Sequence, residues 1–139
     1  SVLPGRVAAA LSDTFPYGNL VITETPYAWL PPAWIEKFAI QENQSIYILY
    51  AHLLETPAVS LGDAVAGCQA IARVGKSGNT DAPHLHLETR LGPAGATFPS
   101  MAGLLAEVSD EERANYKLWR TSGTFLHFDP MRLLAPDLP

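Results

Sequence analysis

The alternation of apolar and polar residues along this chain is typical of β-strands. The pattern is strongest over 45–53, where alternation places Ile46, Ile48, Tyr50 and His52 on one face of a strand. Tyr47, Leu49, Ala51 and Leu53 would take the other face. Shorter runs of the same character predict strands ending at Leu11 and covering 19–24, 69–74, 84–91 and 124–128. The sequence therefore predicts a mainly β fold that opens with an antiparallel pair.

Two segments, 25–43 and 97–124, depart from the strand pattern. The first contains three prolines and several aromatic residues, and a short helix is expected over 32–38, with proline at its start. We expect its aromatic residues to fill the core, with a wall of a substrate groove as the alternative. In the second segment, helical periodicity covers 100–108. Another helix is expected over 110–120, after a capping signal formed by Ser109 and Glu112.

Composition and charge exclude several classes of protein. A chain of 139 residues with 47% hydrophobic residues is expected to form one domain. The net charge of −5 and the lack of a basic block argue against nucleic acid as a partner. The apolar runs are far shorter than the ~20 residues that a membrane-spanning helix needs. The single cysteine, Cys68, excludes an internal disulfide.

The candidate chemistry is concentrated in residues 83–88, which read Pro-His-Leu-His-Leu-Glu. On a strand, His84, His86 and Glu88 would share one face, with the two histidines roughly 7 Å apart. One imidazole could then hold a metal while the other faces a substrate. A surface strand that merely carries two histidines explains the motif equally well, so both interpretations stay open on these residues alone.

Seven short motifs, taken in order, resemble the lysostaphin/LytM-type zinc endopeptidases, which cut peptide cross-links in bacterial peptidoglycan. They are Pro4-Gly5-Arg6-Val7, Tyr17-Gly18-Asn19-Leu20-Val21-Ile22, Tyr50-Ala51-His52-Leu53, Leu61-Gly62-Asp63-Ala64-Val65, the glycine-containing run 69–78, Pro83-His84-Leu85-His86-Leu87-Glu88 and Phe128-Asp129-Pro130. Each motif is weak by itself, but their common order and plausible spacing make the resemblance strong.

The resemblance implies a compact, mostly antiparallel β-sandwich of the duplicated-hybrid-motif type. Residues 1–139 would form a single LytM-like peptidase domain that lacks an upstream segment. The segments at about 25–43 and 97–124 would be insertions carrying short helices, because they are longer than the family's usual connections. Such insertions could reshape the substrate groove or dock a protein partner.

The resemblance also assigns roles to the histidines. His86 would be a zinc ligand, while His52 and His84 would stand beside the metal as catalytic residues without binding it. Zinc lowers the pKa of a bound water to ~7, and the two catalytic histidines would orient or deprotonate that water. No cofactor other than Zn²⁺ is implied. Glu88 and Asp81 receive no family role and are expected to be solvated or structural carboxylates.

Three positions depart from the family pattern or match none of its ligands. His127 matches no ligand position and is expected to be structural or at the surface. Cys68 and Ala72 stand where the family usually has glycine, and we expect Cys68 to be a small buried residue.

The other two zinc ligands of the family come from a His-X-X-X-Asp motif upstream of the first strand, and this sequence does not contain it. The chain opens on Ser1, so we expect an excerpt or a processed chain whose parent supplies the motif. A degenerate member that has lost the motif is the alternative. In either case, these 139 residues alone are predicted not to bind zinc tightly, because one histidine cannot complete a site.

The leading hypothesis is therefore a secreted or cell-envelope bacterial metalloprotease, a zinc-dependent hydrolase of peptidoglycan stem or cross-bridge peptides. The alternative is a non-catalytic LytM-like module that binds the cell wall or activates an amidase. A sugar-phosphotransferase IIA domain, which shares the fold and in which a histidine accepts phosphate, is a weaker third hypothesis.

Overall fold

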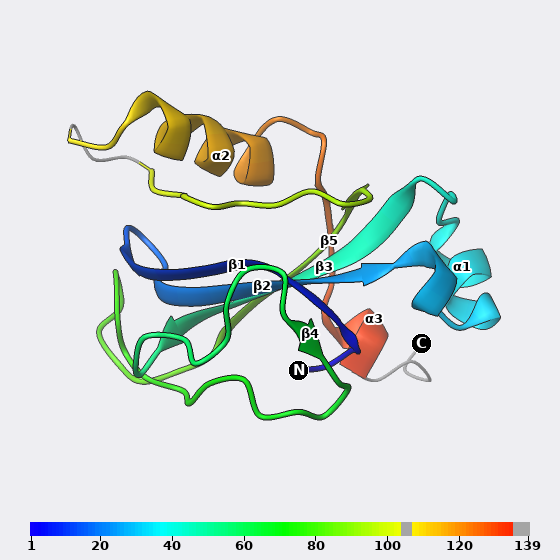
Figure 1. The fold of residues 1–139 in the computed structure, drawn as a ribbon, viewed down its shortest axis with the longest axis horizontal. Helices are drawn as coiled ribbons and strands as arrows, with labels where there is room; N and C mark the ends of the chain where they lie inside the picture. Colours follow the sequence, from blue (N-terminus) through cyan, green and yellow to red (C-terminus); the bar gives the residue numbers. More distant parts are fainter. Residues whose placement is uncertain (104–106, 135–139) are drawn as a thin grey trace.

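A computed structural model describes residues 1–103 and 107–134 of the chain. Its strands form one six-stranded sheet in the order β4-β1-β2-β3-β5-β6, and every neighbouring pair is antiparallel (Figure 1). The strands are β1 (Gly5–Thr14), β2 (Gly18–Pro26), β3 (Gln44–Leu53), β4 (Ala64–Val65), β5 (His86–Pro93) and β6 (Leu126–Phe128). The predicted mainly antiparallel β fold is confirmed.

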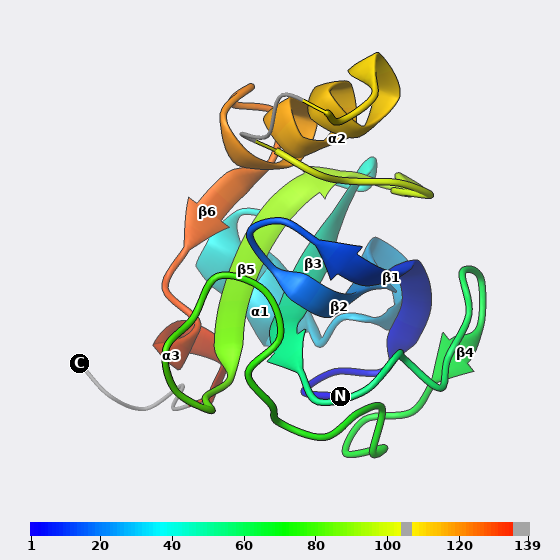
Figure 2. The same cartoon turned by 90° about the vertical axis from the view of Figure 1, so that its left-hand side faces the viewer.

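Short helices and loops, rather than a second ladder of strands, cover the two faces of this sheet in the described residues. The helices are η1 (Tyr27–Trp29), α1 (Pro32–Phe38), α2 (Asp110–Arg120) and α3 (Met131–Leu134). Figures 1 and 2 show α2 over one face, with α1, α3 and the long connection from β3 to β5 on the other side. The helices expected over 32–38 and 110–120 are therefore present.

Each face of the sheet has its own hydrophobic core, as the alternation along β3 requires. The core under α2 contains Ala8, Ala9, Tyr17, Leu20, Ile22, Tyr47, Leu49, Ala51, Phe98, Met101, Tyr116, Trp119 and Phe125. The core on the other face contains Leu3, Val7, Val21, Leu30, Ile40, Ile46, Ile48, Tyr50, Leu53, Val65, Ile71 and Leu133. Segment 97–124 thus packs on one face and segment 25–43 on the other.

The structure corrects two of the predicted elements. Residues 69–74 are not a strand: only Val74 pairs, through an isolated bridge to Leu53. Residues 100–103 of the predicted 100–108 helix are irregular, and 104–106 lie outside the described residues. Helix α2 has the predicted bounds, and its capping box is complete, with the Glu112 backbone N–H donating to the Ser109 hydroxyl and the Ser109 backbone N–H donating to the Glu112 carboxylate.

In the part of the chain that the structure describes, every helix is too short or too polar to cross a membrane.

Candidate functional site

The three predicted site histidines come together at one end of strands β3 and β5. His86 begins β5 opposite Ala51 of β3, and His84 lies just before β5, where it bridges to Gly75. The ring centroid of His52 is 4.8 Å from that of His84 and 5.6 Å from that of His86. The structure therefore brings together side chains that lie up to 34 residues apart in the sequence.

A backbone irregularity brings His52 into this cluster. Its φ is 59°, a left-handed conformation that is uncommon for a residue other than glycine and costs of the order of 1–3 kcal/mol. The pairing of β2 with β3 shifts at the same point, because Asn19 faces Leu53 whereas Val21 faces Tyr50. Two residues of β3 thus lie opposite one residue of β2, which is a β-bulge.

The bulge corrects the predicted face of His52. Simple alternation placed His52 with Ile46, Ile48 and Tyr50, but the ring lies against His86, on the α2 face of the sheet. Leu53, the next residue, correspondingly lies on the opposite face, in the core that contains Tyr50. Because side chains alternate strictly only along a regular strand, one extra residue exchanges the faces of everything beyond it.

Hydrogen bonds define which nitrogen of His52 can accept a proton. Its Nδ1 lies 2.8 Å from the carbonyl oxygen of Ser77, which only accepts, so Nδ1 carries the hydrogen. Burial lowers the pKa of His52 below its ordinary value, against the opposing effect of the Ser77 carbonyl. The ring is therefore neutral near pH 7 and keeps Nε2 as its basic nitrogen.

The glycine-containing turn after β4 fixes the Ser77 carbonyl. Ser77 Oγ donates to the Leu53 carbonyl at 2.7 Å and accepts from the Asn19 backbone N–H at 2.9 Å. Gly18 and Gly78 lie back to back, both with positive φ, and a Cβ on either one would collide with the backbone of the other turn. This close approach explains why the turn needs glycine at these positions.

His84 is exposed and shows a similar arrangement. Its Nδ1 lies 2.9 Å from the Ala82 carbonyl oxygen and 3.2 Å from Thr80 Oγ1. Because the Ala82 carbonyl only accepts, Nδ1 carries the hydrogen. The neutral form of His84 therefore also keeps Nε2 as the basic nitrogen, so both His52 and His84 can accept a proton there.

Glu88 is buried beneath the site, so of the two expected alternatives, a solvated or a structural carboxylate, it is the structural one. The residue is only 6% exposed and accepts hydrogen bonds from four side chains. The donors are Tyr17 Oη at 2.8 Å, His86 Nε2 at 2.9 Å, Arg90 Nε and Nη2 at 3.2 and 2.8 Å, and Trp119 Nε1 at 3.0 Å. Burial by itself would raise the pKa of Glu88, but the bonds from His86, Arg90 and Tyr17 hold it well below its usual range.

The charge on Glu88 fixes the tautomer of His86. An ionised carboxylate can only accept, so the hydrogen between the two groups belongs to His86 Nε2. A neutral His86 then has Nδ1 as its unprotonated nitrogen. Histidines that bind metals commonly donate their other ring N–H to a carboxylate in this way, so the arrangement agrees with the ligand role predicted for His86.

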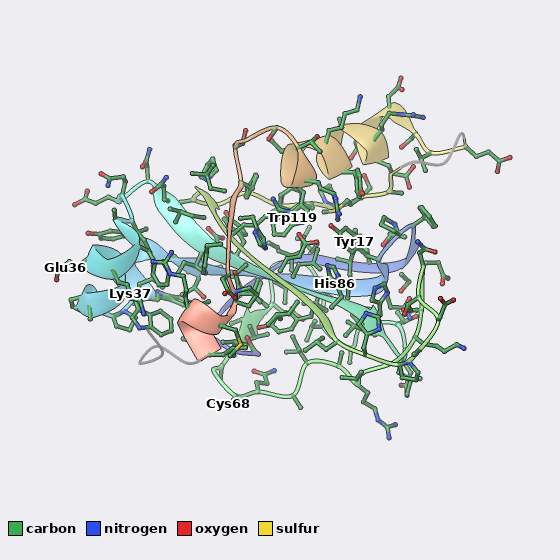
Figure 3. The ribbon with its side chains drawn as sticks, turned by 180° about the vertical axis from the view of Figure 1, so that it is seen from behind. Tyr17, Glu36, Lys37, Cys68, His86 and Trp119 are labelled. Atoms are coloured by element: carbon green, nitrogen blue, oxygen red, sulfur yellow. The ribbon has the colours of Figure 1, made fainter. Side chains whose placement is uncertain are left out.

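Sequence reasoning missed the contribution of segment 97–124 to this site. Trp119 and Arg120 at the end of α2 reach Glu88 and Tyr17, and Arg120 Nη1 donates to Tyr17 Oη at 3.0 Å. Figure 3 shows Trp119 between α2 and the sheet, with Tyr17 and His86 nearby. One available signal was the spacing Glu88-Thr89-Arg90, which puts opposite charges on the same face of a strand as His86.

The remaining candidates lie outside the histidine cluster. Cys68 is exposed, which corrects the expectation of a buried residue, and its φ of 63° explains why the resembling family has glycine there. Asp81 is exposed, as expected for a solvated carboxylate. His127 is an exposed residue of β6, opposite Arg90 of β5.

The residues present do not form a zinc site by themselves. A catalytic zinc needs three protein ligands, usually His, Asp, Glu or Cys. Among the described residues, no group of three or more such side chains is placed to hold a metal ion. Only His86 has both a predicted ligand role and a nitrogen left available by its hydrogen bonding.

A known family model matches the segment that holds the three histidines. The family model described as Peptidase family M23 matches residues 35–97, which include His52, His84 and His86. Among solved structures, the chain is similar to a mutant catalytic domain of the prophage-encoded M23 protein EnpA from Enterococcus faecalis, with 23% sequence identity and a TM-score of 0.48. That similarity covers 68% of this chain, which spans 58% of that catalytic domain. The match of this family model over residues 35–97 confirms the resemblance to M23 peptidases that is seen in the sequence.

Proposed function

We propose that this chain is part of a zinc-dependent endopeptidase that cleaves stem or cross-bridge peptides of peptidoglycan. Its metal site would be completed by residues beyond these 139, since the described part supplies a single ligand, His86. The observation that carries the proposal is the cluster of His52, His84 and His86 within a segment matched by a peptidase family.

In the proposed reaction, His52 and His84 handle protons. Each has its Nδ1–H held by a backbone carbonyl, which leaves Nε2 to accept a proton from an attacking water or to support a developing oxyanion. The lowered pKa of His52 keeps this residue in its basic form near neutral pH. Glu88 does not take part in proton transfer, because its charge is used to hold His86 and Arg90.

The test is hydrolysis of purified peptidoglycan by the full-length parent protein supplied with zinc, measured as the release of new amino termini. We expect His52→Ala to reduce the rate by about 10²–10⁴-fold, the usual contribution of a general base. His86→Ala is expected to abolish both activity and zinc binding. Glu55→Gln, a change on an exposed side chain, is the control and should leave the rate unchanged. Full activity in either histidine variant would contradict the proposal.

A second candidate function is a non-catalytic LytM-like module that binds cell wall or activates an amidase. The absence of a complete metal-ligand group from the described residues favours it. Sedimentation of the parent protein with insoluble peptidoglycan, without release of amino termini at any zinc concentration, would support this candidate over the peptidase.

The expected location follows from the substrate. A peptidoglycan peptidase acts in the bacterial envelope or outside the cell, so we propose an exported protein whose partners are peptidoglycan peptides. An envelope protein that docks through segment 25–43 or 97–124 is a further proposed partner.

A further inference from the structure

An open hollow of about 410 Å³ adjoins the histidine cluster and is not used by the proton-transfer roles proposed above. It is lined by His86, Leu87, Glu88, Arg90, Arg120 and His127. His127 faces Arg90 across the β5–β6 pair, so it lies on the same face of the sheet as Arg90, Glu88 and His86. The hollow therefore extends along β5 from His86 to Arg90 and across to His127 of β6, near the end of α2 that carries Arg120.

Of the two arginines that line this hollow, Arg90 is neutralised by close contact with Glu88, whereas Arg120 lies farther from that carboxylate. Arg90 is 7% exposed and fully engaged: it donates twice to Glu88 Oε2 and once, through Nη1, to the Phe125 carbonyl. The Glu88–Arg90 pair thus has no net charge. Arg120 adds a second guanidinium, 3.6 Å from Glu88 Oε1, which is beyond hydrogen-bond distance.

Arg120 has hydrogen-bond donors that no described residue uses. A guanidinium carries five N–H groups, and in the described part of the chain only Nη1 of Arg120 donates, to Tyr17 Oη. Its side chain is 44% exposed, so the remaining donors are accessible from the hollow's solvent side. Because Tyr17 fixes one end of the guanidinium, less rotational freedom is lost when a ligand binds the other end.

We propose that Arg120, with His127 on the opposite strand, forms a subsite for a carboxylate group of the peptide substrate. The planar guanidinium fork matches the two oxygens of a carboxylate, and a ring N–H of His127 can add a third hydrogen bond. Since His86 lines the same hollow, the recognised carboxylate lies close to the bond that is cut. This inference rests on the proposed function and adds a preference for peptides with a free carboxylate.

The test is calorimetric titration of the zinc-loaded full-length protein with two stem tetrapeptides, one ending in a free D-alanine carboxylate and the other in its carboxamide. We expect the acid to bind about tenfold more tightly than the amide, the size of one charge-assisted hydrogen bond. Arg120→Gln should remove this preference, and Arg120→Lys should keep part of it as a point charge. Arg113→Gln, on the same helix, is the matched control and should keep it fully.

Equal affinities for acid and amide in the wild-type protein, or no binding of either, would overturn the proposal. An undiminished preference in Arg120→Gln would do the same, while thermal denaturation of each variant identifies loss of fold. His127→Ser keeps the Tyr17–Arg120 bond and is expected to weaken acid binding alone. Mass spectrometry of the titrated samples reports hydrolysis separately, so a peptidase without the carboxylate preference and a binding module with it are distinguishable outcomes.

Discussion

Segments 25–43 and 97–124 look alike in the sequence, since both interrupt the strand pattern with short helices, but they do different work in the fold. Helix α1 of the first segment has no buried residue, and its side chains cover the core on the far side of the sheet from the histidines. Helix α2 of the second segment buries Tyr116 and Trp119 on the histidine face. The face on which an insertion packs, rather than its length, determines whether it can act on the site.

The two segments also differ in the contacts that their polar and charged side chains make. Segment 97–124 supplies two donors to the network behind His86: Trp119 to Glu88, and Arg120 to Tyr17. In segment 25–43, cations pack instead on aromatic rings, such as Arg132 of α3 over Phe38 at 4.5 Å. We therefore expect changes in α2 to reach the site and changes in α1 to affect stability alone.

The largest difference between the segments is expected for their tryptophans. Trp119→Ala should reduce the free energy of unfolding by about 4 kcal/mol, because it empties a fully buried position and removes a donor to Glu88. Trp34→Ala in α1 removes a half-buried ring and should cost roughly 1–2 kcal/mol. Urea unfolding of both variants measures the difference. Equal losses of unfolding free energy would show that the two segments stabilise the fold to the same extent.

The next effect concerns the carboxylate that connects α2 to the site. Glu88→Gln leaves the guanidinium of Arg90 buried without a counter-charge, so we expect a loss of about 3 kcal/mol. The double variant Glu88→Gln, Arg90→Met should recover much of this loss in the same urea experiment. If the single variant is as stable as the wild type, the network does not stabilise the fold.

A smaller effect is expected from pH. The pKa of Glu88 is held below its usual value in the folded protein, so its contribution to stability is complete above the unfolded value of about 4.5. That contribution declines as the pH falls below 4.5, and the free energy of unfolding should fall with it. In Glu88→Gln the decline between pH 4.5 and 3 should be shallower, and an identical decline in both proteins would contradict the account.

The smallest effect is expected at the start of α2, far from the histidines. Ser109→Ala removes the side-chain cap on the Glu112 backbone N–H and should cost about 1 kcal/mol of stability. Peptide hydrolysis by the folded variant should be unchanged, since Trp119 and Arg120 stand at the other end of the helix. Thermal denaturation and the amino-terminus assay check these two outcomes.

Local patterns predicted much of this fold. Alternation located β2, β3, β5 and β6, and the Ser109–Glu112 signal located α2, because strand faces and helix caps depend on neighbours in sequence. Residues 69–74 were wrongly predicted as a strand, since an apolar run does not show whether a pairing partner is present.

The site could be predicted only in part. The motifs predicted three site histidines, and the structure brings these residues together. The position of His52, however, depends on a bulge that the alternation of β3 does not reveal. The burial of Glu88 depends on Trp119, which is 31 residues away along the chain and reaches it only through tertiary packing. Contacts of this range have no signature in a local pattern.

Glu88, supported by Trp119 of α2, holds His86 in the tautomer whose Nδ1 is available to a ligand. Nitrogen-15 NMR of the histidine side chains in the metal-free protein near neutral pH tests this directly. We expect a proton on Nε2 of His86 and none on Nδ1 in its neutral form. A neutral His86 with its proton on Nδ1 would show that Glu88 does not fix this tautomer.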